Sequence, residues 1–511
     1  MLSLEPQAGQ TLRRVKIESS NRKRRLSSEV VSPWASLVIW ILVGAIIFGL
    51  PLRILSFGYL PGDDALRHAA KAMSGKPWSE ILLLRPEITI DHNPGWHWLL
   101  GSLHRLAGWD ARQLVVFSVI AMFVVFAVSP LPWLKRTEAW LVSITLILLV
   151  FPYYADRLML GRPLLLTTAV TLVVLSLWTR AENRGAVQAM LVTTILFAIS
   201  TWIHGSWYLL LLLPAAFLLA RRWREAVLLG ICWAAGSILG AVLTGHPWTF
   251  LKQSASIPFL AFGVNAQSLV TEFEPFSGSY PALIVVAAVL AARKFAGLPF
   301  TAILRDPVLW LAIVGWALGF RVVRFWLDWS IPPLALWFGR QFQELLDVWA
   351  PKMPWVRVAV ASLAALILFA VVANDQNGRW SNYGKFECLD AKRPELAGWL
   401  PDPGGVLYSV DQTIFYETFF CNPHGDWRYA LGFEPSFMRT EDLAVYQELC
   451  STLNALRACA PWVKRMTLAD RLVLRSGPDI RPAIPELEWH YAANRTWVGR
   501  LPRTQRSETN P

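Results

Sequence analysis

Two adjacent carboxylates, Asp63 and Asp64, open a polar segment that directly follows a long apolar run. Charged side chains beside lipid are costly unless they have partners or a task. A carboxylate in this position can act as a general base, because burial and neighbouring charges can tune its pKa. The pair also fits a structural role, since Asp63 can cap a helix that begins at Asp64.

A second polar cluster, Asp91-His92-Asn93-Pro94, lies further along the same segment. It leads into the apolar stretch 92–107, which is short for a membrane span and carries several His and an Arg. We therefore predict a helix that lies on the membrane surface. Counting this stretch as a span would place every later basic loop on the outer side.

Four arginines stand at helix ends that the charge pattern of the loops puts on the outer side: Arg157, Arg162, Arg321 and Arg324. Snorkelling at the interface is one explanation. Arginine is uncommon on that side, however, and guanidinium groups bind phosphate well, so we favour a phosphate site. His204, at another such end, is a further candidate, although it also fits an interfacial histidine with ordinary partners.

The elements that must position these residues are apolar. The chain has 511 residues, of which 54% are hydrophobic and 16% charged, a composition that points to lipid as the solvent. The run 33–52 is uncharged and long enough to cross a hydrocarbon core of roughly 30 Å. We predict eleven transmembrane helices, near 33–52, 112–133, 138–154, 163–179, 186–203, 206–220, 226–243, 280–292, 308–320, 331–347 and 355–373.

Basic residues occupy every second loop between these runs: Lys135/Arg136, Arg180/Arg184, Arg221/Arg222/Arg224, Arg293/Lys294/Arg305 and Lys352/Arg357. The N-terminal tail is basic as well. The positive-inside rule then places the tail and all these loops in the cytoplasm. The net charge of +12 is thus explained by membrane topology, and we expect no nucleic-acid partner.

This topology predicts a cytoplasmic tail (1–32), a transmembrane domain (33–373) with a long first periplasmic loop (57–111), and a periplasmic soluble domain (374–511). The protein would lie in a bacterial inner membrane. Four of the five cysteines fall in the last domain, as expected for an oxidising compartment. Strand-like segments at 405–410 and 472–475 predict a small mixed α/β fold there.

Helix geometry limits which disulfide pairs the cysteines of this domain can form. A helix over 441–460 would put Cys450 and Cys459 on opposite faces, roughly 13 Å apart and too far to bond. We therefore expect each, if it is oxidised, to pair with Cys388 or Cys421, unless the helix breaks first.

The order of features resembles the GT-C superfamily of integral-membrane glycosyltransferases, with the protein O-mannosyltransferase and aminoarabinose transferase branches as the nearest look-alikes. In those enzymes the first outer loop holds an Asp-Glu pair and then a His-Pro-Pro or Lys-Pro-Pro turn. Here Asp63-Asp64 and His92-Asn93-Pro94 stand in these places. The second acid and the middle of the turn depart from the pattern.

This resemblance implies an enzyme that moves a sugar from a polyprenyl-phosphate carrier to a periplasmic lipid, glycan or protein. Asp63 or Asp64 would be the catalytic base. Substrate binding would fall to Asp91, His92, His204 and the four outer arginines. No cofactor is expected.

The same resemblance raises the question of a metal site. Thr271-Glu272-Phe273-Glu274 has the Thr-x-x-Glu outline of oligosaccharyltransferases, and Asp64, Asp156 and Glu274 together would offer hard oxygen ligands. The Trp-Trp-Asp-Tyr-Gly acceptor motif of those enzymes is absent from the sequence. We predict no metal.

Two other functions fit the sequence. The chain could be a non-catalytic scaffold derived from a GT-C enzyme, which docks a partner protein complex through its periplasmic domain. It could also be a transporter, but transporters place polar groups at mid-membrane, whereas here they gather at the outer edge. We rank transport last.

Overall fold

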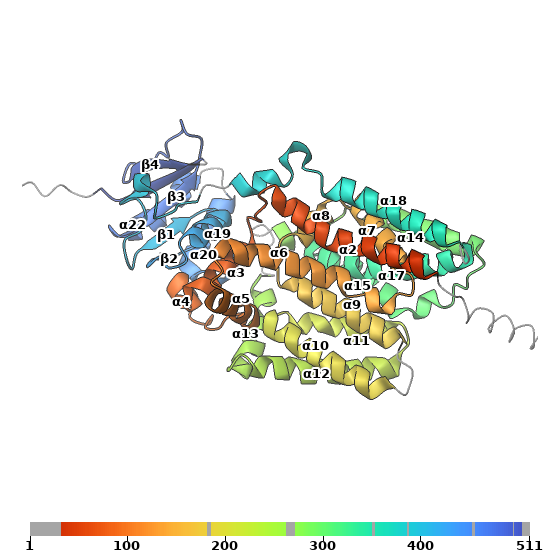
Figure 1. The fold of residues 1–511 in the computed structure, drawn as a ribbon. Coiled ribbons are helices and arrows are strands. Elements are labelled where there is room, and N and C mark those ends of the chain that lie inside the picture. Colours follow the sequence, from red (N-terminus) through yellow and green to blue (C-terminus); the bar gives the residue numbers. More distant parts are fainter. Residues whose placement is uncertain are drawn as a thin grey trace, which may run out of the picture.

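The computed structural model describes residues 32–180, 185–261, 271–349, 353–385, 388–451, 455–493 and 495–502. The predicted tail 1–32 lies, except for Ser32, outside these residues, as do Arg184 and Lys352 of the basic loops. A helical bundle forms one end of the molecule and a small sheet domain the other (Figure 1).

Each predicted span coincides with a helix, one of them beginning as a 3-10 turn. The helices are α2 (Pro33–Ser56), α6 (Ala111–Val128), α7 (Thr137–Val150), α9 (Leu164–Arg180), α10 (Ala186–Ile203), η3 (Trp207–Leu211) with α11 (Leu212–Leu219), α12 (Trp223–Val242), α14 (Tyr280–Phe295), α15 (Pro307–Gly319), α17 (Ile331–Trp349) and α18 (Pro354–Val372). Within the described ranges, five helices are long and apolar enough to cross a membrane: α2, α6 with the turn after it, α10, α12 and α18. Eleven crossings remain a prediction.

Small residues let two of these helices approach closely. A Cβ atom added to Gly240 of α12 would lie 2.4 Å from the carbonyl oxygen of Ala198 on α10. One added to Gly236 would lie 2.6 Å from Cβ of Phe197. Glycine at these two positions therefore allows the backbones to pack at a distance that no side chain permits.

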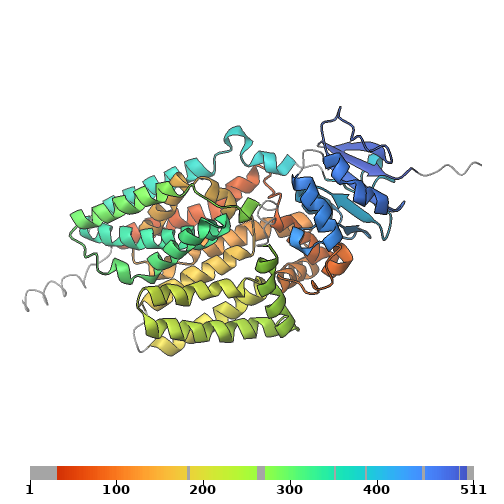
Figure 2. The same cartoon turned by 180° about the vertical axis from the view of Figure 1, so that it is seen from behind.

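Short helices connect the bundle to the sheet domain. The first polar segment forms α3 (Asp64–Ser74), α4 (Trp78–Ile81) and α5 (Pro94–Ala107), and the last of these is the helix predicted over 92–107. Further short elements are α8 (Tyr153–Leu158), α13 (Pro247–Ala261), η4 (Thr271–Phe273) and α16 (Val323–Phe325), the last followed by a π-helical turn (Trp326–Ser330). In both views α3, α4 and α5 lie at the end of the bundle that meets the sheet domain (Figures 1 and 2).

The C-terminal domain is built on a five-stranded mixed sheet, which confirms the predicted strands. Its order is β2 (Arg428–Tyr429), β1 (Val406–Ser409), β3 (Arg471–Arg475), β5 (Thr496–Arg500) and β4 (Glu488–Ala493). The strand β1 runs parallel to both neighbours, with Tyr408 opposite Leu472, and the other pairs are antiparallel. Helices α19 (Gln412–Cys421), α20 (Thr440–Ser451), α21 (Ala455–Ala458) and α22 (Ala460–Arg465) complete it.

The predicted cysteine pairing is wrong. Cys388 bonds to Cys421, while Cys450 and Cys459 are free. The reason is a contact between segments distant in sequence: the side chain of Asn422 donates to the carbonyl of Leu389, at 2.7 Å, and so holds the two segments together. The predicted 441–460 helix is interrupted at Cys459, between α21 and α22. Its first part is α20, and residues 452–454 lie outside the described residues.

The two ends of the molecule are joined by backbone pairing. The N–H of Leu83 donates to the carbonyl of Tyr429 at 2.9 Å, so the segment after α4 extends the sheet at β2. The Lys76 ammonium also pairs with Asp426 at 2.9 Å. These contacts hold the sheet domain against the polar end of the bundle.

Candidate functional site

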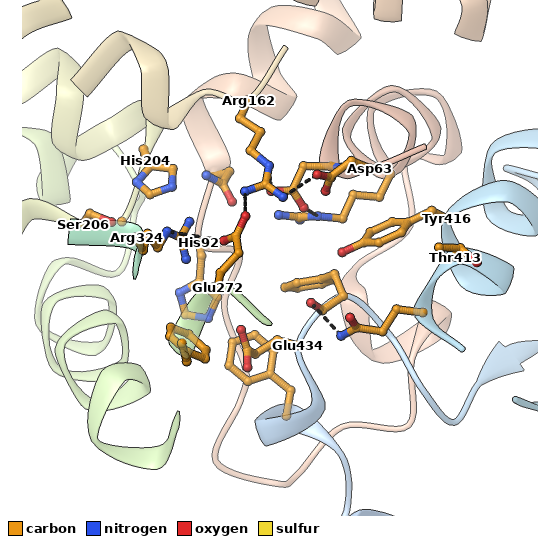
Figure 3. A pocket seen from close by; sticks show the side chains of 18 of the residues that line it. Asp63, His92, Arg162, His204, Ser206, Glu272, Arg324, Thr413, Tyr416 and Glu434 are labelled. Carbon is orange, nitrogen blue, oxygen red and sulfur yellow. Dashed lines mark hydrogen bonds and ion pairs between the residues drawn. The ribbon is translucent and has the colours of Figure 1, made fainter. Parts of the chain in front are cut away.

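A cavity of about 560 Å³ lies where the bundle meets the sheet domain (Figure 3). Its walls come from both ends of the chain. The bundle side contributes Asp63, Asp64, Arg67, His92, Arg162, His204, Ser206, Tyr208, Glu272 and Arg324, and the sheet domain contributes Asp411, Gln412, Thr413, Tyr416, Phe433, Glu434, Phe437 and Tyr446, among others.

The acidic pair has both of the roles considered from sequence. Asp63 caps α3, since its Oδ1 accepts from the N–H of Asp64 at 2.6 Å, and its Oδ2 pairs with Arg162. Asp64 accepts from Nε of Arg67 at 2.7 Å and lies 3.4 Å from Nε of Arg162. Both carboxylates therefore line the cavity while they are held by neighbouring groups.

The two carboxyl groups differ in proton affinity. Burial raises the pKa of Asp63, and the nearby charge of Arg162 only partly offsets this effect. Burial would raise the pKa of Asp64 as well, but there the charges of Arg67 and Arg162 outweigh it and lower the pKa. Asp63 is thus the stronger base of the pair, and Asp64 stays ionised.

Three arginines surround Glu272. Arg157 donates to it at 2.5 Å, Arg162 pairs with it, and Nε of Arg324 lies 3.7 Å away. Arg157 also binds Asp328 through two nitrogens, at 3.0 and 2.6 Å. Arg324 makes the longest contacts of the three, and its side chain is 31% exposed. It is the cation best able to take an incoming anion.

The structure brings most of the predicted site residues together. Those lining the cavity are Asp63, Asp64, His92, Arg162, His204 and Arg324. Three others do not line it: Arg157 is bonded to Glu272 and Asp328, Asp91 is bonded to His97, and Arg321 is exposed.

Asp91 belongs to a buried chain that orients the helices of the site. Its Oδ2 accepts from Nδ1 of His97 at 2.5 Å, and Nε2 of His97 lies 2.7 Å from Nδ1 of His68 on α3. This chain fixes α3, which carries Asp64, against α5 and the turn that carries His92. Asp91 therefore positions the site without lining it.

The two cavity histidines are neutral near pH 7. Burial lowers the pKa of His92 to about 4 and that of His204 to about 3. Their loops touch, because the N–H of Gly205 donates to the carbonyl of His92 at 2.9 Å. Each histidine can offer one N–H and one lone pair, and neither carries a charge.

Several lining residues were not singled out from the sequence. Arg67 carries one usable signal, since it lies one helical turn after Asp64. Glu272 lies within the Thr-x-x-Glu outline, in which the sequence points to Glu274 as the acid to consider. Glu434 gives no local signal; burial in the folded chain raises its pKa to about 7. Arg67 also lies 4.0 Å above the ring of Phe433.

The metal ligand set considered from sequence is not assembled. Within the described part of the chain, no group of three or more His, Cys, Asp or Glu side chains is placed to hold a metal ion. Asp156 pairs with Arg379 at 3.0 Å, and Asp64 with Arg67. Two of the three acids considered as ligands are thus paired with arginines.

Comparison with known proteins yields structural likenesses only. No family model matches the chain, and no curated protein does. It resembles the archaeal oligosaccharyltransferase AglB from Archaeoglobus fulgidus, in complex with an inhibitory peptide and a dolichol-phosphate, at 12% identity and a TM-score of 0.46, over 88% of this chain and 70% of that one. It also resembles the Archaeoglobus fulgidus oligosaccharyltransferase tethered to an acceptor peptide containing the NVT sequon, at 11% identity and a TM-score of 0.46, over 86% and 69%.

Both neighbours belong to the GT-C superfamily, the group that the sequence resembles. At this identity and TM-score, neither likeness assigns an activity or a residue role to this chain.

Proposed function

We propose that this protein is a membrane glycosyltransferase that moves a sugar from a polyprenyl-phosphate carrier to an acceptor hydroxyl. One observation carries the proposal: a partly buried acidic pair faces arginines and neutral histidines in a cavity at the polar end of an apolar bundle. Cleaving a sugar–phosphate bond needs a base for the acceptor, stabilisation of a cationic sugar, and cations for the departing phosphate.

Arg324 is the proposed phosphate ligand, because its existing ion pairs are the weakest by distance. Close to it in sequence, Trp326 forms part of a second cavity of about 560 Å³. That cavity is lined almost wholly by apolar side chains, more than half of them from α14, α15 and α17, such as Leu283, Leu290, Ile313 and Leu334. A polyprenyl tail can follow this groove while its phosphate reaches Arg324.

Asp63 is the proposed base. In the reaction it would accept the proton of the acceptor hydroxyl as that oxygen attacks the anomeric carbon. The bond from sugar to phosphate breaks, and the phosphate keeps the electron pair beside Arg324. Asp64 would stay ionised and hold Arg67 and Arg162 in place. The acceptor would enter along the sheet-domain wall that carries Tyr416 and Glu434.

The proposed setting is a bacterial inner membrane, crossed eleven times by residues 33–373. The N-terminus would be cytoplasmic, and both the cavity and the domain 374–511 would be periplasmic. The alternating basic loops support this arrangement. The acceptor, whether lipid, glycan or protein, would then be a periplasmic molecule.

The direct test is transfer by the purified protein in lipid nanodiscs, supplied with polyprenyl-phosphate sugars and an extract of periplasmic acceptors. The double variant Asp63→Asn, Asp64→Asn should lose at least about a hundredfold in product formation, the usual contribution of a general base. Thermal melting would establish that the variant is folded. Undiminished product in a folded double variant would exclude the mechanism.

A scaffold subunit is the second candidate, and one observation favours it. Arg157 pairs with Glu272 and Asp328, and Arg162 pairs with Glu272 and Asp63, as the members of a purely structural network would. This function requires stable co-purification with a partner complex, and assembly that tolerates the same Asp→Asn changes.

A further inference from the structure

Gln253 lies next to the cavity and is hydrogen-bonded to the segment that carries His92, one of the lining residues. It is part of α13, is only 6% exposed, and is not among the lining residues. Its side-chain oxygen accepts from the backbone N–H of Thr89 at 3.1 Å. Its side-chain nitrogen lies 3.3 Å from the carbonyl oxygen of Ile90 and 3.1 Å from Nε2 of His92.

These backbone partners fix the orientation of the amide. A backbone N–H can only donate and a carbonyl can only accept, so a flipped Gln253 would oppose donor to donor at Thr89 and acceptor to acceptor at Ile90. The Gln253 nitrogen must therefore be the donor to His92. It follows that Nε2 of His92 is an acceptor and that the ring proton is on Nδ1.

In the part of the chain that the structure describes, this Nδ1–H has no acceptor. Nδ1 of His92 is buried and, among the described residues, makes no hydrogen bond. Leaving a buried donor unpaired is unfavourable, so such groups in a binding cavity are typically satisfied by a ligand or by water. In Figure 3, His92 lies on the same side of the cavity as Arg324 and His204, across from Tyr416 and Thr413 of the sheet domain.

We propose that Gln253 sets the tautomer of His92, and that the resulting Nδ1–H donates to an anionic oxygen of the phosphate held at Arg324. The assignment rests on the proposed function for the identity of that phosphate. His92 is then a substrate ligand and Gln253 a positioning residue. In the opposite tautomer, the Nδ1 lone pair would face the phosphate oxygen and repel it.

The tautomer can be read directly, without any donor. The full chain, with its 8 histidines ¹⁵N-labelled, is examined by NMR in nanodiscs, and the His92 signals are assigned by their loss in His92→Leu. The wild type should show a protonated Nδ1. Gln253→Met, which removes the amide but keeps the length, should shift His92 toward the Nε2–H form. A wild-type signal of the Nε2–H form would overturn the proposal.

Binding of undecaprenyl phosphate, added to the nanodiscs, tests the second half. His92→Leu and Gln253→Met should each weaken it by about tenfold or more, the effect of one hydrogen bond to a charged group. Because Gln253 acts through His92, the double variant should bind no more weakly than His92→Leu alone. If the losses in binding free energy of the two single variants add in the double variant, Gln253 acts independently of His92. That result would overturn its role as a positioning residue for His92.

Two further outcomes separate the inference from the proposed function. Competition by millimolar inorganic phosphate would assign the site to free phosphate and overturn the lipid assignment. If the wild type does not bind undecaprenyl phosphate, the polyprenyl-phosphate donor of the proposed function is excluded. The proposed hydrogen bond from His92 to its phosphate is then excluded as well. The tautomer spectrum would still decide what Gln253 does.

Discussion

Asp63 and Asp64 are neighbours of the same chemical type, yet the fold shifts their pKa values in opposite directions. Both are partly buried, and this loss of solvent favours the neutral acid. Only Asp64 has two arginines close enough to reverse that preference. Of these two adjacent residues, Asp63 is therefore suited to accept a proton, whereas Asp64 is suited to stay charged.

A pH profile should detect this division. Transfer should fail as pH falls through the raised pKa of Asp63, because a protonated acid cannot act as the base. The charge of Asp64 helps to raise that pKa. Asp64→Asn should therefore lower it and move the acid limb of kcat/KM to lower pH. The change Asp479→Asn, at an exposed position, serves as control. A limb that moves upward would contradict the assignment.

Glu434 gives a second prediction at this scale. Its pKa of about 7 means that it gains a negative charge as pH rises through neutrality. The new charge lies in the cavity that would bind phosphate, so the KM for the donor should rise between about pH 6 and 8. Glu434→Gln should flatten this dependence, whereas Glu395→Gln, at an exposed site, should leave it intact. A wild-type KM without change over this range would contradict the prediction.

At the scale of elements, sequence was informative wherever a local pattern decides the outcome. Apolar runs predicted the helices of the bundle, and the strand-like segments 405–410 and 472–475 predicted β1 and β3. The disulfide was missed because the proximity of Cys388 and Cys421 depends on a tertiary contact, that of Asn422 with Leu389. Glu434 was missed for a similar reason, since only the folded chain brings it into the same cavity as Asp63.

Helix packing is open to a matched test on α12. Gly240→Ala would place Cβ 2.4 Å from a backbone oxygen of α10, a clash that backbone movement must relieve at about 1–3 kcal/mol. Gly230→Ala, on the same helix, meets nothing within 4 Å. Thermal melting in nanodiscs should show a clear loss for the first variant and little change for the second. Equal melting temperatures would contradict the close approach of α10 and α12.

At the scale of the whole molecule, the side of the membrane on which the sheet domain lies can be measured. Cys450 is exposed and Cys232 is buried. If the domain is periplasmic, a membrane-impermeant thiol reagent should label Cys450 in intact spheroplasts, and Cys450→Ser should abolish that labelling. Labelling that appears only after lysis would put the domain in the cytoplasm and reverse the proposed topology.

The pairing of Leu83 with Tyr429 joins an early part of the chain to a late one. The cavity can therefore form only after most of the chain has been synthesised. Asp63 and Asp64 leave the ribosome early, but the opposite wall, from Asp411 to Tyr446, is made near the end of synthesis. Contacts between segments so distant in sequence form late in folding. The helices can therefore insert among membrane lipids, the proposed donor included, before the cavity is complete.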